Sequence, residues 1–157
     1  MKEIYLFTDG SCLNNPGPGG LAAILKYQGG EKELSCGYKL TTNNRMELLA
    51  VIKGLAVLKE PCAVTVVCDS QYVKNGMTFW LKKWKNRSWI TSSGSPVKNK
   101  DLWMQLEAAC QKHQIRWQWI KGHSGHPENE RCDELARAAA LKKPRETDEG
   151  FESPVLP

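Results

Sequence analysis

The stretch FTDGSCLNNPGPGG, residues 7–20, begins as an apolar strand and ends in a run of turn-forming residues. A single carboxylate, Asp9, lies where the two parts meet. Gly10, Pro16 and Gly17 allow the backbone to stay close to a bound ligand. Because Asp commonly ends a strand in a turn, Asp9 taken alone is more simply structural. Its role depends on what the rest of the chain brings beside it.

Five apolar segments predict a sheet. Three of them form consecutive antiparallel strands, with Gly29-Gly30 as the hairpin turn between the second and the third. The fourth is nearly all apolar and β-branched, which is typical of a strand buried on both faces. The five segments are EIYLFT (3–8), LAAILKYQ (21–28), KELSCGYKL (32–40), CAVTVVCD (62–69, ending in a carboxylate) and IRWQWI (115–120).

The remaining segments are helical. Apolar residues recur at helical spacing from Asn43 to Leu58, which predicts a helix of about four turns, capped by Thr42 or Asn43 and with Glu47 in its first turn. Further helices are expected at 70–86, 99–113 and 128–143. The predicted fold is therefore α/β: a mixed five-stranded sheet, three antiparallel plus two parallel strands, flanked by helices. One domain is expected over residues 1–142 and a disordered tail over residues 143–157.

Composition excludes several classes of protein. Hydrophobic residues make up 41% of the 157 residues, and no apolar run approaches the roughly 18 residues of a membrane span. The N-terminus does not resemble a signal peptide, so a cytoplasmic protein is expected. Six scattered cysteines without a CxxC pair are read as free thiols. The group His123, His126 and Cys132 lacks the second ligand pair of a zinc site.

Four carboxylates are placed to converge. Asp9 and Asp69 follow apolar strands that we expect to lie parallel and side by side, and Glu47 and Asp133 lie early in helices that can lean over the same edge of the sheet. Each of the four taken singly is more simply structural. Together they form an all-oxygen site of the kind that binds Mg²⁺, and two such ions would activate a water and stabilise a leaving oxygen in phosphodiester hydrolysis.

Positive charge is concentrated in one segment. Residues 70–100 contain no Asp or Glu, and Trp80, Trp84 and Trp89 are interleaved with the cations. A solvated helical face with tryptophans in a satellite core is one interpretation, and contact with nucleic acid is the favoured one. The basic residues are Lys74, Lys82, Lys83, Lys85, Arg87, Lys98 and Lys100.

Four blocks of this sequence resemble the active-site blocks of bacterial type-1 ribonuclease H, in the order and spacing of that family: DGSCLNNPGPGG, TTNNRMELLAVIKGL, VVCDSQYV and GHSGHPENERCDELAR. The resemblance covers residues 3 to about 142 and implies that the α/β fold is ribonuclease H-like. It implies hydrolysis of the RNA strand of an RNA/DNA hybrid to 5′-phosphate and 3′-hydroxyl products by a two-metal-ion mechanism, with one or two Mg²⁺ ions as cofactor and Mn²⁺ as a substitute.

The resemblance also assigns residues. Asp9, Glu47, Asp69 and Asp133 match the metal-binding carboxylates, and His123 matches a mobile-loop histidine that handles a proton or helps product leave. Residues 77–100 resemble a basic protrusion that grips the DNA strand. The residues expected to contact substrate are Cys12 (through its backbone), Asn15, Thr42, Asn43, Asn44, Gln71, Trp80, Lys82, Lys83, Trp84, Lys85 and Arg87.

Some of these matches have a competing interpretation. Asn15 and Asn43 could equally be turn and cap residues. Thr42 matches a phosphate-pocket threonine, but where several bacterial members have an Asn on the following helix this chain carries Lys83. His113 and His126 are read as structural or solvent-exposed. Packing roles are expected for Trp103, Trp117 and Trp119.

Three alternatives compete with a free-standing nuclease. A module that binds hybrids without cutting them predicts loss of a carboxylate, yet all four are present. A transposase or integrase core usually carries extra DNA-binding domains. A domain excised from a reverse transcriptase fits the Met1 start and the expected tail less well. A monomer that acts on RNA/DNA hybrid and has no membrane partner is the favoured interpretation.

Overall fold

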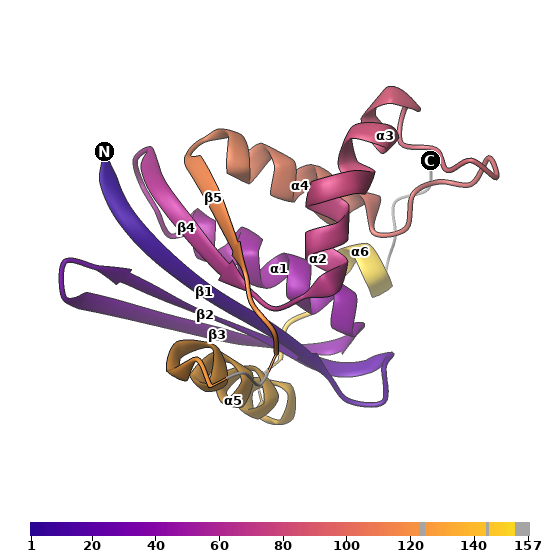
Figure 1. The fold of residues 1–157 in the computed structure, drawn as a ribbon. Helices are drawn as coiled ribbons and strands as arrows, with labels where there is room; N and C mark the ends of the chain where they lie inside the picture. The colour runs from indigo at the N-terminus through magenta and orange to yellow at the C-terminus, as the bar shows by residue number, and fades with distance from the viewer. Residues whose placement is uncertain (123–124, 144, 153–157) are drawn as a thin grey trace.

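A five-stranded mixed sheet forms the centre of the computed structural model, which describes residues 1–122, 125–143 and 145–152 (Figure 1). The strand order is β3-β2-β1-β4-β5. β1, β2 and β3 pair antiparallel, whereas β1, β4 and β5 pair parallel, so the predicted fold class is confirmed. The strands are β1 (Lys2–Cys12), β2 (Gly17–Tyr27), β3 (Gly30–Thr41), β4 (Cys62–Cys68) and β5 (Gln114–Trp119).

Helices cover both faces of the sheet. Figure 1 shows α1 and α4 on one face and α5 on the other. The segment predicted as one helix over residues 70–86 contains a π-helical turn, η1, between two short α-helices. The helices are α1 (Asn43–Ala56), α2 (Gln71–Asn75), η1 (Gly76–Trp80), α3 (Leu81–Asn86), α4 (Lys100–Gln111), α5 (Pro127–Leu141) and α6 (Glu149–Glu152).

Side chains alternate across the sheet, so the two faces have separate apolar cores. Leu6 of β1 belongs to the larger core under α1 and α4, with Met46 and Trp103. Phe7, the next residue, belongs to the smaller core under α5, with Val67. Because burial of each such side chain contributes about 1.5 to 3 kcal/mol, both layers fix the register of β1 and β4.

The β2–β3 hairpin turns one residue earlier than predicted. Tyr27 pairs with Gly30, and the two turn residues are Gln28 and Gly29 with φ of 45° and 78°. Gly30 therefore belongs to β3, not to the turn. Left-handed φ at both central residues is what a two-residue hairpin requires, and glycine meets that requirement without strain.

β1 is longer than its apolar sequence indicates. Its antiparallel pairing with β2 continues to Cys12↔Gly19, so Asp9 lies inside the strand. The prediction that Asp9 follows the end of a strand is wrong, whereas Asp69 does follow β4 directly. The difference arises because β2 continues beside β1 after β4 has ended.

The prediction of a disordered tail is wrong for residues 145–152. Glu146 pairs with the edge of β3: its N–H donates to the Gly37 carbonyl at 2.7 Å, and its carbonyl accepts from the Lys39 N–H at 2.9 Å. Asp148 is buried, and α6 follows it. No local pattern in the sequence indicates this packing, because Asp148 has partners as far back in the chain as Thr41 and Arg45. Residues 153–157 lie outside the described residues.

The basic segment stands away from the sheet. α3 and the loop after it project from the end of α2 (Figure 1). At its base, a Cβ on Gly76 would lie 1.9 Å from the Trp103 ring, so this turn of helix rests directly on that ring. Trp103 is fully buried, which confirms its predicted packing role. In the described part of the chain, no helix combines the length and the apolar character needed to cross a membrane, and the six cysteines are free, as predicted.

Candidate active site

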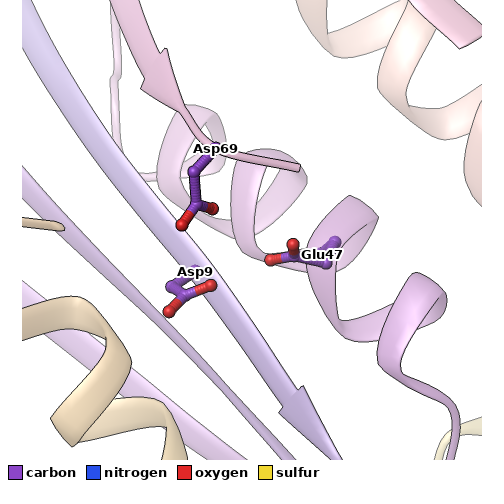
Figure 2. Close-up of side chains that lie close together, drawn as sticks. All are labelled: Asp9, Glu47 and Asp69. Atoms are coloured by element: carbon purple, nitrogen blue, oxygen red, sulfur yellow. The ribbon is translucent and has the colours of Figure 1, made fainter. Parts of the chain in front are cut away.

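Strand register brings the first two carboxylates together. β1 and β4 run parallel with Phe7 opposite Val67. Asp9 and Asp69 each lie two residues further along the sequence, so they occupy equivalent positions on two adjacent parallel segments of the chain. Figure 2 shows their side chains beside that of Glu47, which comes from α1. Each of the three carboxylates has an oxygen within 4.8 Å of an oxygen of the others.

Gly10 holds two of these carboxylates in place. Its N–H lies 2.9 Å from Asp9 Oδ1 and 2.6 Å from Glu47 Oε1, so one donor serves both. A Cβ at position 10 would lie 2.5 Å from the Glu47 nitrogen. Since no real Cβ fits at that distance, glycine is required for α1 to approach β1 this closely.

Glu47 lies deeper in its helix than predicted. Thr42 is the N-cap of α1, and its side chain accepts a hydrogen bond from the Arg45 N–H at 3.3 Å. Glu47 is the fifth residue of the helix, and no acidic residue lies in the first turn. The prediction of a first-turn position is therefore wrong. The second-turn position is the one that faces Gly10.

Burial and mutual repulsion both favour the neutral forms of these carboxyls. Burial raises the pKa of Asp9, the charge of Asp69 adds to the effect, and the resulting pKa is about 7. Burial also raises the pKa of Glu47 well above its usual value, with Asp9 and Asp69 adding to the effect. Carboxylates in such a place become fully charged only when a cation compensates them.

Asp133 belongs to the same cleft but not to the group of three. Its position on α5 lets its charge reach Asp9, and its carboxylate accepts a hydrogen bond from Arg137 one turn further along. The cleft has a volume of about 410 Å³. It is lined by Asp9, Gly10, Asn43, Asn44, Glu47, Asp69, Ser70, Gln71, Tyr72, Ile120, Lys121, His126, Asn129, Glu130 and Asp133.

The donor set fits a hard divalent cation. The three clustered groups offer carboxylate oxygens alone, which is the chemistry that Mg²⁺ and Mn²⁺ prefer. The cleft beside them, with a volume of about 410 Å³, has room for a phosphate. Asp9, Glu47 and Asp69 would hold the ion, with Asp133 at the edge of the site.

Several predicted substrate residues lie around this cleft. Asn43, Asn44 and Gln71 line it. Asn15 accepts a hydrogen bond from the Asn43 N–H at 3.0 Å, so these two lie side by side. The Cys12 thiol donates to the Thr41 carbonyl at 3.4 Å, which links the end of β1 to the end of β3. Substrate contact by these residues stays a prediction.

The residues of the protrusion divide into two groups. Trp80, Trp84 and Trp89 form a chain of ring contacts with centroids 5.7 and 6.1 Å apart. Trp84 also packs on Trp103 at 5.4 Å, so it has a packing role whatever else it contacts. By contrast, the side chains of Lys82, Lys83, Lys85 and Arg87 are exposed on and after α3, with Lys85 paired to Glu107 at 2.6 Å.

Sequence reasoning missed several residues of the cleft, among them Asn129, His126 and Tyr72. Asn129 is buried and donates to the Val67 carbonyl at 3.3 Å, which ties α5 to β4. His126, the N-cap of α5, lines the cleft, although the sequence favours a structural or solvent-exposed position for it. Tyr72 follows Gln71 on α2 and lines the cleft as well. For Tyr72 the available signal was its place next to a predicted site residue, and for the other two it was their place in the block that contains Asp133.

The other histidines and tryptophans can be assigned in part. His113 accepts a hydrogen bond from the Cys62 N–H at 3.1 Å, which confirms its structural role. Trp117 and Trp119 stack at 4.8 Å against the larger core, which confirms their packing role. His123, the predicted loop histidine, lies outside the described residues.

Comparisons with known proteins agree with this arrangement. The family model described as RNase H matches residues 1–141. Ribonuclease H of Citrobacter koseri is 60% identical over 153 residues, covering 98% of each chain. Ribonuclease H of Shewanella sp. (strain ANA-3) is 59% identical over 152 residues, covering 97% of this chain and 96% of the relative.

Solved structures share the fold. The crystal structure of LC9-RNase H1, a type 1 RNase H with the type 2 active-site motif, has a TM-score of 0.80 and 33% identity over 90% of this chain and 73% of that one. LC11-RNase H1, solved in complex with RNA/DNA hybrid, has a TM-score of 0.64 and 21% identity over 88% of this chain and 96% of that one, and supports the fold alone.

A mixed sheet of this order, with carboxylates gathered where β1 and β4 lie side by side, defines a ribonuclease H-like α/β protein. The chain belongs to the ribonuclease H family. The predicted resemblance is thereby confirmed.

Replacing Asp9 should stabilise the metal-free protein. The pKa of Asp9 is about 7 in the folded chain against 3.8 for the free group. The contribution of Asp9 to the free energy of unfolding is therefore fully present below about pH 4 and is lost as the pH rises through 7. Asp9→Asn removes that pH-dependent loss. At pH 8 with EDTA we expect its free energy of unfolding to exceed that of the native chain by about 1 to 3 kcal/mol, measured by urea unfolding.

The pH dependence of this difference is the control. The gain of Asp9→Asn should shrink toward zero as the pH falls to 4. Addition of Mg²⁺ at pH 8 should stabilise the native chain more than the variant, because the variant lacks a ligand charge. A gain that stays constant between pH 4 and 8 would show that repulsion at Asp9 is not its cause.

Gly10→Ala should displace α1 from β1. The added methyl would collide with backbone atoms at 2.5 Å, so we expect a loss of about 2 to 3 kcal/mol in stability and much weaker Mg²⁺ binding. Gly30→Ala is the matched control, because its Cβ meets only the Tyr27 carbonyl at 3.2 Å. Metal titrations of both variants by calorimetry measure the effect. Native Mg²⁺ affinity in Gly10→Ala would contradict the assigned role.

Proposed function

We propose that this chain hydrolyses the RNA strand of RNA/DNA hybrids, releasing 5′-phosphate and 3′-hydroxyl ends, by a two-metal-ion mechanism with Mg²⁺ as cofactor and Mn²⁺ as a substitute. The observation that carries this proposal is the group Asp9, Glu47 and Asp69, with oxygens within 4.8 Å of one another in an open cleft. Bacterial relatives named ribonuclease H, about 60% identical over nearly the whole chain, support it.

The protein supplies ligands and positions. Bound divalent cations would supply activation of the attacking water and stabilisation of the leaving oxygen of the phosphodiester. Asp9, Glu47 and Asp69 would hold them, and the Gly10 N–H keeps two of these carboxylates in fixed orientation. Asp133, held by Arg137 at the edge of the cleft, completes the negative charge of the site. His123 is proposed to handle a proton or help product leave.

Recognition of RNA requires contact with the 2′-hydroxyl, which is both a donor and an acceptor. Asn43, Asn44 and Gln71 present amides at the cleft, and amides can serve both roles. Asn15 is already used in part, since its Oδ1 accepts from the Asn43 N–H. These side chains would read the minor groove beside the carboxylates, together with the backbone at Cys12.

The protrusion is proposed to hold the DNA strand. Its exposed cations Lys82, Lys83 and Arg87 have no acidic neighbour in the sequence between residues 70 and 100. Lys83 takes a place where several bacterial members have Asn, and as a point charge it would bind phosphate with less geometric selectivity. A protein that binds hybrids without cutting them is the weaker candidate, because all four carboxylates are retained. We propose that the chain acts as a cytoplasmic monomer.

Cleavage of labelled RNA/DNA hybrid, duplex RNA and duplex DNA in Mg²⁺ tests the proposed function. The native chain should cut the RNA of the hybrid alone. Asp69→Asn keeps the shape of the side chain and removes a ligand charge, so activity should fall by about three orders of magnitude or more. Binding of hybrid without cutting in either Mg²⁺ or Mn²⁺ would favour the binding-module alternative.

Salt dependence tests the protrusion. Removing one cation that neutralises a phosphate should reduce the slope of log K against log salt by about 0.7 to 0.9. A triple variant, Lys82→Gln, Lys83→Gln and Arg87→Gln, should therefore lower the slope for hybrid binding by about two to three. The charge-matched control changes Lys2, Lys32 and Lys112, which do not line the cleft, to Gln. Equal slopes in the two variants would reject the assigned surface.

A further inference from the structure

Arg45 is a buried cation two residues before Glu47. Its side chain is 3% exposed. Its Nε and Nη2 donate to the two oxygens of Asp148 at 2.8 and 3.0 Å. Its Nη1 and Nη2 donate to the two oxygens of Asp101 at 2.9 and 2.7 Å. The guanidinium therefore makes bidentate pairs with two carboxylates that come from distant parts of the chain.

Asp148 is held from a second direction. Its Oδ2 also accepts a hydrogen bond from Thr41 Oγ1 at 2.6 Å, at the end of β3. The segment lies so close that a Cβ at Gly150 would lie 2.0 Å from Asp101 Oδ2 and 2.5 Å from Arg45 Nη2. Residues 145–152 are thus fitted against the start of α1 and the start of α4.

The same network reaches the base of the protrusion. Arg45 Nη1 donates to Asn99 Oδ1 at 3.3 Å. Asn99, which has φ of 60° and caps α4, donates through Nδ2 to the Tyr72 hydroxyl at 3.0 Å, as does Trp103 Nε1. Tyr72 lines the carboxylate cleft, and its ring meets Trp80 at 5.8 Å.

Loss of one carboxylate would leave the buried Arg45 guanidinium without part of its charge compensation. A buried guanidinium left with one carboxylate keeps a large desolvation cost, whereas the bidentate pairs offset that cost. Its backbone N–H bonds to Thr42 Oγ1, so a shift of Arg45 reaches the cap of α1 and the adjacent Asn43 and Asn44. Arg45 also contacts Asn99, which lies near the C-terminal end of the basic segment, residues 70–100. Movement at Arg45 therefore acts on both sides of the cleft.

We propose that Asp148 is a positioning residue for the hybrid: through Arg45 and Asn99 it fixes the placement of the Asn43–Asn44 end of α1 relative to the base of the protrusion at Tyr72 and Trp80. This inference rests on the proposed function. A hybrid that contacts both the cleft and the protrusion would then bind two sites held at a fixed distance from each other. Removal of the Asp148 carboxylate leaves each surface intact and loosens their spacing.

Two hybrids separate positioning from stability. One is long enough to lie on the cleft and on α3 together, and the other is too short to reach α3 while its RNA lies at the carboxylates. In Asp148→Ala we expect KM for the long hybrid to rise about three- to tenfold, with kcat nearly unchanged. KM for the short hybrid should stay near its native value, so the advantage of the long hybrid falls.

Matched variants complete the test. Gly150→Ala keeps the Asp148 carboxylate but pushes the segment off Arg45, and should act in the same direction. Asp148→Asn keeps the size of the side chain and is decisive if Asp148→Ala does not fold. Ile4→Ala, in the core at the other end of β1, supplies a destabilised control. All are assayed well below their own melting temperatures.

The outcomes are distinct. A reduced long-hybrid advantage in the Asp148 and Gly150 variants, absent in Ile4→Ala, supports the proposal. An unchanged KM in folded Asp148 variants, or an equal change in Ile4→Ala, overturns it and leaves a purely structural ion pair. If the native chain cuts neither hybrid, the proposed function itself fails, and this inference fails with it.

Discussion

Repulsion between carboxylates is the constraint on which the rest of the structure depends. Oxygens of Asp9, Glu47 and Asp69 lie within 4.8 Å of one another, where each fully charged pair repels by about 3 kcal/mol at an effective dielectric constant of about 20. Without protonation of these groups or a bound cation, the fold must supply that energy from elsewhere. Two apolar layers on opposite faces of β1 and β4 hold the strands in register, and the Gly10 N–H offsets part of the charge.

β1 serves both halves of the sheet. It pairs antiparallel with β2 and parallel with β4. The parallel side brings Asp9 and Asp69 to equivalent positions, whereas the antiparallel side continues to Cys12 and carries the strand beyond the site. The loop after β1 therefore starts from a supported strand, and Asn15 can bond to the first helical residue of α1. The metal-binding groups and the proposed groove contacts are both fixed by the same strand.

The sequence predicted what local patterns determine. Apolar periodicity located the five strands and most helices. The positions of acidic residues after two strands and near the starts of two helices indicated four converging carboxylates, of which Asp9, Glu47 and Asp69 form the close group. Prediction from sequence failed where the local structure depends on residues far apart in the chain. The ordered position of Asp148 depends on Arg45, and the position of the turn at Gln28–Gly29 depends on the register of β2 and β3. The π-helical turn at Gly76 was also missed, because its helical pattern looks continuous until Trp103 is placed beside it. His126 and Asn129 lie in the same sequence block as Asp133, but it is the path of α5 that brings them to the cleft.

The Trp103 ring fills the space that a side chain at position 76 would need. A Cβ at position 76 would lie 1.9 Å from the indole ring, and Trp103 is fully buried. In evolutionary terms the two positions are epistatic: any larger residue at 76 becomes acceptable only after the residue at 103 has shrunk. Because the Trp103 indole also donates to Tyr72, that first step would remove a hydrogen bond beside the cleft. Descendants of this sequence therefore have few paths by which the base of the protrusion can change one residue at a time.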